Sequence, residues 1–233
     1  MIDSVFNPTL AFLTNIVMLF ITAAKEKFAF PVISTGRKFA YYRKTFFNSK
    51  SETEVLNSLK GKKIVDIGCG LTPYITESMF QVCRQNDIDF YGVDPKLEEG
   101  FKFGPFDKFK VMIIGGSGSI DPNAQGLEKG IATLADDLPF EDESTDLILS
   151  CFLIYAWIND EAVLESIFRE FHRILKPGGQ VKIYPTPYKT SLKTKTAGFK
   201  DIMSDFDIEQ KFTGLQLRPI TYPPSYMTTY TKK

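Results

Sequence analysis

Beyond about residue 51, blocks of apolar residues recur at lengths typical of buried strands, separated by more polar stretches. The pattern predicts five strands, in KKIVDIGCG (62–70), DFYGVDP (89–95), GIATLADDLPF (130–140), STDLILSCF (144–152) and GGQVKIYP (178–185). We expect EAVLESIFREFHRIL (161–175) to form a helix, and Ser51 followed by Glu54 predicts a capping box that opens another helix. Strands that alternate with helices are typical of a doubly wound, mostly parallel α/β sheet.

The end of the chain follows a different pattern. Two strand-like runs, DIEQKFTGLQLR (207–218) and SYMTTYTK (225–232), flank a Tyr-Pro-Pro turn. We expect them to form an antiparallel pair at one edge of the sheet. The predicted sheet is therefore mixed only at its C-terminal edge.

An apolar segment occupies the start of the chain. Residues 5–24 bear no charge, and on a helix their few polar residues form a thin stripe along an apolar rod. No basic residue precedes the segment, which argues against a secretory signal, and its apolar run is short for a bilayer span of about 20 residues. Three alternatives stay open: packing on the domain or a partner helix, association with a membrane surface, and a true span. Basic residues follow the segment, so insertion leaves the rest of the protein in the cytoplasm.

These patterns divide the chain into an N-terminal helical extension (1–50) and one α/β domain (51–233). Within the domain, the glycine-rich residues 96–130 are interpreted as an insertion or mobile loop. Lysine plus arginine equals aspartate plus glutamate, at 28 each, so nothing indicates the broad basic face of a general nucleic-acid binder. One histidine and three scattered cysteines argue against a zinc site or a disulfide framework, and favour a reducing, cytoplasmic compartment.

Candidate chemistry begins where the first predicted strand of the domain ends. In VDIGCG (65–70), Asp66 is followed by two glycines, Gly68 and Gly70, which let the backbone approach a nucleotide closely. Asp94 ends the second strand at the spacing where a dinucleotide-binding fold places a carboxylate on ribose hydroxyls. The structural alternatives are a helix or turn cap for Asp66 and a turn residue of an Asp-Pro pair for Asp94.

Four motifs occur in an order that a known family shares. IVDIGCG, GVDP, LADDLPFEDESTDLILS and FREFHRILKPGG resemble the successive motifs of class I S-adenosylmethionine-dependent methyltransferases of the small-molecule type, from about Lys62 to Tyr184. The resemblance implies a Rossmann-like fold and S-adenosyl-L-methionine as cofactor. It also implies cofactor-binding roles: at the methionine moiety for Asp66, Gly68, Cys69 and Gly70, at the ribose for Asp94 with Pro95, at the adenine for Leu134, Ala135 and Asp136, and beside the cofactor for Cys151.

The resemblance also implies where a substrate enters. Tyr155 and Trp157 follow the fourth strand, at the expected substrate mouth, and aromatic faces hold cationic or planar molecules. Ordinary packing of the loop is the alternative. Tyr41 and Tyr42 are placed to close over the cofactor, as N-terminal helices do in similar enzymes. His172 is interpreted as a surface or capping residue of its helix, so no catalytic base is assigned.

The expected function is methyl transfer to a small, lipophilic or amine-containing molecule. Two departures from the family pattern, Leu71 in place of a third glycine and Leu134 in place of an acidic residue, motivate the alternative of a non-catalytic, cofactor-binding regulatory or partner subunit. A dehydrogenase is disfavoured because Pro73 breaks the G-x-G-x-x-G pattern and the sequence has no Tyr-x-x-x-Lys pair.

Overall fold

The computed structural model describes residues 37–48, 50–99, 121, 123–186, 196–213 and 225–233. The apolar segment 5–24, most of the 96–130 stretch and the Tyr-Pro-Pro turn lie outside these residues. In the part of the chain that the structure describes, no helix is long and apolar enough to cross a membrane.

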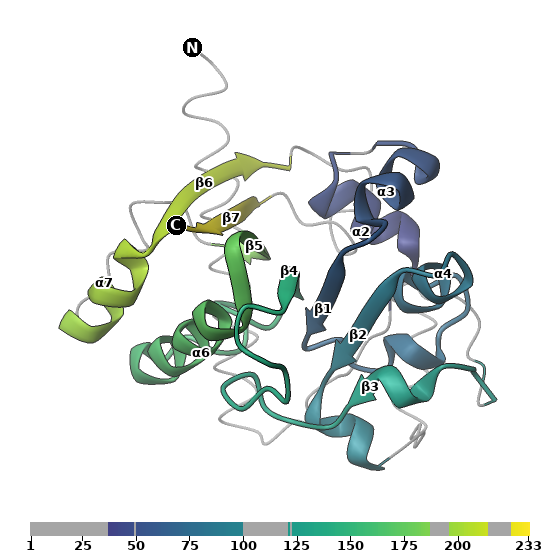
Figure 1. The fold of residues 1–233 in the computed structure, drawn as a ribbon, viewed down its shortest axis with the longest axis horizontal. Coiled ribbons are helices and arrows are strands. Elements are labelled where there is room, and N and C mark those ends of the chain that lie inside the picture. Colours follow the sequence, from purple (N-terminus) through teal and green to yellow (C-terminus); the bar gives the residue numbers. More distant parts are fainter. Residues whose placement is uncertain (1–36, 49, 100–120, 122, 187–195, 214–224) are drawn as a thin grey trace.

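A seven-stranded sheet forms the centre of the domain, in the order β3-β2-β1-β4-β5-β7-β6 (Figure 1). Strands β1 to β5 pair in parallel, whereas β7 is antiparallel to both of its neighbours. The strands are β1 (Lys63–Ile67), β2 (Asp89–Val93), β3 (Gly130–Ile131), β4 (Thr145–Cys151), β5 (Leu175–Thr186), β6 (Phe206–Phe212) and β7 (Tyr226–Lys232). This topology confirms the predicted doubly wound sheet with an antiparallel C-terminal pair.

Helices cover both faces of the sheet, as Figure 1 shows. One face packs on α2 (Phe39–Phe46), α3 (Glu52–Leu59) and α4 (Met79–Gln85), and the other on α6 (Glu161–Ile174) and α7 (Ala197–Ser204). Successive residues of a strand point to opposite faces of the sheet. Ile64 therefore packs in the core cluster under α2, α3 and α4, and Val65 in the cluster under α6 and α7. Short 3-10 turns connect these elements, at η1 (Thr72–Tyr74), η2 (Pro95–Glu99) and η3 (Leu127–Lys129).

Local signals account for the helix starts. The predicted capping box is present at α3: the Ser51 side chain accepts from the amide of Glu54, and the Glu54 carboxylate accepts from the amide of Ser51. The Asp160 side chain caps α6 in a related way, by accepting from two amides of its first turn. Both helices therefore begin where a side chain satisfies otherwise unpaired backbone donors.

The structure departs from the sequence-based expectation at three places. The strand predicted over 130–140 is only two residues long, because the chain turns after it, with the amide of Asp137 donating to Leu134, and Pro139 has no amide to extend a ladder. Helix α7 was not expected. Helix α2 falls within residues 1–50, and its buried residues pack in one core cluster with those of α3 and α4.

Candidate cofactor site

The carboxyl ends of the parallel strands meet at one edge of the sheet, hereafter the carboxyl edge. The chain runs outward from β1 to β2 and β3 and then returns to β4, so β1 and β4 flank the point where the order reverses. Open α/β sheets bind ligands at such a switch point. Asp66, Asp94 and Cys151 all lie at this edge, at or just after the ends of β1, β2 and β4.

The turn after β1 has room only for glycine at its first position. Gly68 has a φ of +73°, and a Cβ there would lie 2.8 Å from the side chain of Leu153. Two turn amides, those of Gly68 and Cys69, donate to the carbonyl of Val93 at 2.8 and 3.2 Å. The turn is therefore tied to the end of β2, where Asp94 follows.

Asp94 joins the turn directly. One carboxylate oxygen accepts from the amide of Gly70 at 2.9 Å, and the other accepts from the amide of Lys96 at 3.0 Å. Asp94 thus has the turn role that was the structural alternative. Each oxygen of a carboxylate accepts more than one hydrogen bond, so this role leaves capacity for the two hydroxyls of a ribose.

Asp66 is fully buried beneath helix α2. The Tyr42 hydroxyl donates to one carboxylate oxygen at 2.5 Å, and the other oxygen, Oδ1, has no hydrogen-bond partner among the described residues. Burial raises the pKa of Asp66 from 3.8 to about 7, while the hydrogen bond from Tyr42 and the positive charge of Arg37 act in the opposite direction. Tyr42 therefore contacts Asp66 at this edge, and its expected closure over the cofactor stays a prediction.

The loop after β3 carries the three adenine candidates. Leu134 is 60% exposed, an unusual state for a large apolar side chain, whereas Ala135 is buried. The exposed Asp136 accepts a long hydrogen bond, 3.5 Å, from the hydroxyl of Ser166 on α6. Of the three, Leu134 has an exposed apolar side chain that could contact a planar ring, and the carboxylate of Asp136 contacts α6.

The thiols at this edge are poorly suited to act as nucleophiles. Cys69 and Cys151 are both buried, and burial raises the pKa of Cys151 to about 12 and that of Cys69 well above its ordinary value. Sequence reasoning did not single out Ser150, whose buried hydroxyl on β4 has no hydrogen-bond partner in the part of the chain that the structure describes. A serine inside an apolar strand carries no sequence signal of that kind.

Tyr155 and Trp157, the two aromatic substrate candidates, are both half-buried. The Tyr155 hydroxyl is 3.1 Å from that of Tyr230, and its ring packs near Phe168, with 6.4 Å between ring centroids. Burial raises the pKa of Tyr155 to about 12. These contacts favour the packing alternative for Tyr155, which packs against the core cluster beneath α6.

The sole histidine lies near the other end of the parallel strands. His172 is in the last turn of α6, where its ring meets Phe206 edge-on, and burial lowers its pKa. Its backbone carbonyl accepts a hydrogen bond from Lys232. His172 thus packs at the surface of the domain, as predicted.

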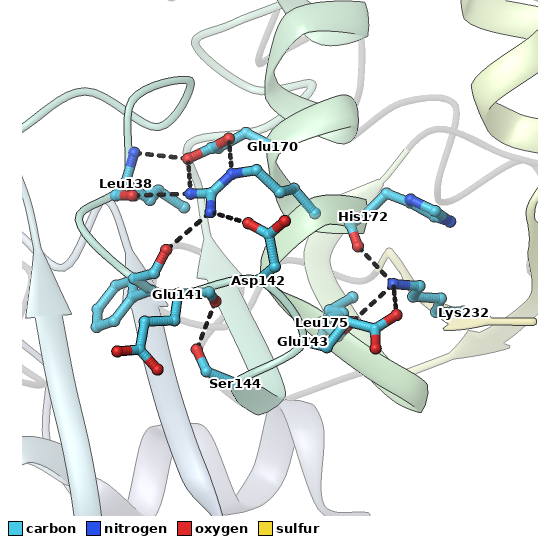
Figure 2. A network of polar contacts seen from close by, with 11 residues as sticks. Leu138, Glu141, Asp142, Glu143, Ser144, Glu170, His172, Leu175 and Lys232 are labelled. Carbon is cyan, nitrogen blue, oxygen red and sulfur yellow. Dashed lines mark hydrogen bonds and ion pairs between the residues drawn. The ribbon is translucent and has the colours of Figure 1, made fainter.

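Two of the sequence motifs meet in a network at this opposite edge, hereafter the Arg173 clamp (Figure 2). Arg173, from FREFHRILKPGG, makes two hydrogen bonds to the Glu170 carboxylate, at 2.8 and 2.6 Å. Three more bind the loop that contains LPFED, through Asp142 Oδ1 (2.7 Å) and the carbonyls of Phe140 (2.8 Å) and Leu138 (3.0 Å). All five donors of a guanidinium are thereby used. The two motifs therefore hold one loop against one helix.

Comparison with known proteins adds an independent finding. Residues 120–183 match a protein family described as a methyltransferase domain. The predicted resemblance to class I methyltransferases is confirmed. The matched residues include the loop after β3 and the Arg173 clamp, while the glycine turn and Asp94 precede them.

No curated protein sequence matches the chain. Among solved structures, a Pyrococcus horikoshii OT3 protein is 19% identical, with 82% of this chain and 96% of that one covered and a TM-score of 0.42. A methyltransferase from Methanosarcina mazei described as SAM-dependent is 15% identical, with coverages of 77% and 96% and a TM-score of 0.43. The magnesium protoporphyrin IX methyltransferase of Synechocystis PCC 6803, solved with bound SAM, is 13% identical, with coverages of 93% and 97% and a TM-score of 0.44.

Proposed function

We propose that this chain is an S-adenosylmethionine-dependent methyltransferase that acts on a small molecule by in-line methyl transfer. The observation that carries the proposal is the turn after β1, where Gly68 has no room for a side chain and Gly70 is tied to Asp94. Such a turn lets a nucleotide approach the backbone, and the neighbouring carboxylate is placed to accept from a vicinal diol. The family match of residues 120–183 supports the same assignment.

The residues at the carboxyl edge fit the parts of this cofactor. Asp94 and Pro95 would hold the ribose, and the loop of Leu134, Ala135 and Asp136 would hold the adenine. The open Oδ1 of Asp66 is a buried acceptor without a partner, which suits the cationic end of the methionine moiety. Gly68, Cys69, Gly70 and Cys151 would border the same moiety.

When bound, the cofactor supplies a methyl group on a sulfonium centre. The contribution of the chain is to orient donor and acceptor, which provides much of the acceleration in a displacement of this kind. An amine acceptor needs only to arrive neutral, whereas a hydroxyl needs a base. The raised pKa values of Cys151 and Tyr155 leave both groups protonated at neutral pH, which favours an amine-containing or lipophilic acceptor held near Trp157.

A non-catalytic subunit that binds the cofactor is the second candidate. Leu71, which replaces the family's third glycine, is fully buried, and Leu134 replaces an acidic residue. Incubation with a metabolite extract and a labelled methyl donor separates the two candidates. Label in any extracted product identifies an enzyme, whereas cofactor binding without transfer identifies a binding subunit.

Cofactor binding itself is tested at Asp94. Loss of its hydrogen bonds to a ribose should weaken S-adenosylhomocysteine binding by roughly 5- to 150-fold, or about 1–3 kcal/mol. Titration calorimetry on the wild type and on Asp94→Ala measures this change, with Asp89→Ala as a control at the opposite end of β2. Equal affinities for wild type and Asp94→Ala, or no binding by the wild type, would sink the assignment.

We further infer that residues 5–24 bind a lipid surface and raise the local concentration of a lipophilic acceptor. Their lack of charge and the basic residues that follow support this inference, since each such residue adds about 1 kcal/mol near an anionic surface. The full-length chain should sediment with anionic liposomes, and a chain starting at residue 26 should stay in solution with its cofactor affinity intact. Loss of folding on truncation, without liposome binding by the full chain, would assign the segment to the core instead.

A further inference from the structure

A polar pocket lies at the edge of the sheet opposite the carboxyl edge. It is formed between α4, the start of β2 and the residues that precede β3, and all of its lining residues belong to the described part of the chain. Its volume is about 410 Å³, within the range of about 300–1,000 Å³ that small-molecule sites occupy. Four charged residues line this pocket: Arg84, Asp87, Asp89 and Lys129.

Contacts within the domain fix the position of Arg84. Its Nε donates to Oε1 of the buried Gln81 at 2.9 Å. The side-chain amide of Gln81 in turn donates to the carbonyls of Pro73 and Gln125, at 2.6 and 3.0 Å. Gly126 has a φ of +79°, and a Cβ there would overlap with the Cδ atom of Arg84, so only glycine leaves room for the arginine side chain. The contact with Gln81 does not involve the two terminal nitrogens, which form the fork that binds a carboxylate.

The charges around the pocket balance. Nζ of Lys129 lies 2.7 Å from Oδ1 of Asp89, so these two groups neutralise each other. Arg84 and Asp87 supply a second pair of opposite charges from one turn, in which the amide of Asp87 donates to the carbonyl of Arg84 at 3.3 Å. No ion pair joins the side chains of these two described residues, although both line the same pocket. The pocket therefore presents a cationic and an anionic group to one ligand.

A molecule with a carboxylate and an amino group matches this arrangement. We propose that the pocket binds a small zwitterion, whose carboxylate is bound by the fork of Arg84 and whose ammonium group donates to Asp87. A strand rises about 3.3 Å per residue, so the start of β2 at Asp89 is separated from Asp94 by roughly 15 Å. A methyl acceptor in this pocket could not reach a cofactor at the carboxyl edge, and the zwitterion is therefore an effector and not a substrate.

Strand β3 connects the pocket to the candidate cofactor site. Lys129 directly precedes β3, and the carbonyl of Ile131 accepts from the amide of Asp94 at 3.1 Å. Because β3 has only two residues, contacts of the preceding segment with α4 and β2 help to fix its position. A ligand in the pocket adds to these contacts, so it should favour cofactor binding, and the coupling is reciprocal. This effector role rests on the proposed function, whereas zwitterion binding does not.

Three related compounds test which groups the pocket recognises. 4-Aminobutyrate has both an amino group and a carboxylate, butyrate lacks the amino group, and butylamine lacks the carboxylate. In NMR titrations of the full chain at constant ionic strength, the backbone amide signals of Gly126 and Lys129 should shift and saturate with 4-aminobutyrate. Its affinity should exceed those of butyrate and butylamine by about 5- to 20-fold.

Two substitutions assign the two ends of the ligand. Arg84→Met should reduce the affinity for 4-aminobutyrate to that for butylamine, and Asp87→Asn should reduce it to that for butyrate. Both side chains are exposed, so both variants should fold. Arg169→Met removes a guanidinium from an exposed position of α6, outside the pocket, and should leave all three affinities unchanged.

The effector role has its own measurement. Saturating 4-aminobutyrate should tighten S-adenosylhomocysteine binding by about fivefold in the wild type and not in Arg84→Met. The zwitterion site is overturned if the amide shifts do not saturate, or if Arg84→Met and Arg169→Met weaken binding equally. An unchanged S-adenosylhomocysteine affinity overturns the effector role. If the wild type does not bind S-adenosylhomocysteine at all, the proposed function fails, and the amide shifts still decide whether the pocket binds a zwitterion.

Discussion

Arg173 and Arg37 lie at opposite edges of the parallel sheet and differ in how many hydrogen bonds they make to the described residues. In the Arg173 clamp, five hydrogen bonds use every donor of the guanidinium, and Lys232 adds bonds to the carbonyls of His172 and Leu175 and to Glu143 (Figure 2). At the carboxyl edge, Arg37 has two aromatic neighbours and none of these bonds among the described residues, and the buried Asp66 keeps one oxygen unpaired.

This difference separates a structural network from a binding site. A fully satisfied polar network stabilises one arrangement of the chain, whereas buried charges with unused capacity lower the stability of the unliganded fold. Buried charges with unused capacity are stabilised only when a ligand supplies the missing hydrogen-bond partners. The motifs LPFED and FREFHRILKPGG thus contribute to the site by fixing the framework, and Asp66 and Asp94 are charged groups that would meet the cofactor under the proposed function.

Substitution of Arg173, the central cation of the Arg173 clamp, should change the free energy of unfolding the most. Arg173→Met leaves the mostly buried Glu170 and two loop carbonyls without a donor, so the free energy of unfolding should fall by about 3 kcal/mol. Arg169→Met, on the same helix but with an exposed ion pair to Glu165, should cost less than about 1 kcal/mol. Urea denaturation measures both values, and similar losses would contradict the central role of Arg173.

Removal of the buried charge at the carboxyl edge should stabilise the protein, and more so at higher pH. Because the pKa of Asp66 in the folded chain, about 7, lies above its ordinary value of 3.8, the folded state holds the proton more tightly and loses stability as the pH rises between these values. Tyr42, Arg37 and Asp94 are the charged or titratable groups that act on it. Asp66→Asn should therefore gain roughly 2–3 kcal/mol more relative to wild type at pH 8 than at pH 5.

Asp146 provides the matched comparison at the opposite edge. Burial alone raises its pKa, but hydrogen bonds from Lys176 and from the amide of Lys63 lower it below its ordinary range. A depressed pKa contributes stability at every pH above about 4, so Asp146→Asn should destabilise the fold by about 1 kcal/mol at both pH 5 and pH 8. Thermal unfolding between pH 5 and pH 8 should show that Asp66→Asn raises the free energy of unfolding and that Asp146→Asn lowers it. A change of the same sign for both substitutions would refute the contrast between the edges.

The smallest change in stability is expected at Trp157. Because its side chain is only half-buried, Trp157→Ala should cost less than about 1 kcal/mol while it impairs methyl transfer to the acceptor. Tyr155→Phe, which removes the hydroxyl next to Tyr230, should cost about 1 kcal/mol and leave transfer unchanged. Melting curves and transfer of labelled methyl groups measure these effects, and a strong loss of stability at Trp157 would mean that its ring is packed in the core.

Local patterns in the sequence predicted most of the strands and the helices α3 and α6. Strand-length apolar blocks, the capping box at Ser51 and the helix over 161–175 each depend on residues close together in the chain, and the resulting sheet confirms them. The spacing also predicted that Asp94 follows β2 near the glycine turn, whereas its hydrogen bond to Gly70 is seen only in the structure. The short β3 shows the limit of this approach, since an apolar run cannot reveal where a turn replaces a strand.

The tertiary structure alone decided which polar residues keep unused capacity. Arg37 and Phe152 are far apart in sequence, as are Tyr42 and Asp66, and no periodicity brings either pair together. It likewise placed the hydroxyl of Tyr155 next to that of Tyr230, 75 residues later in the chain. Such contacts depend on burial and on the crossing of distant elements, and a side chain's free hydrogen-bonding capacity is known only when all of its neighbours are.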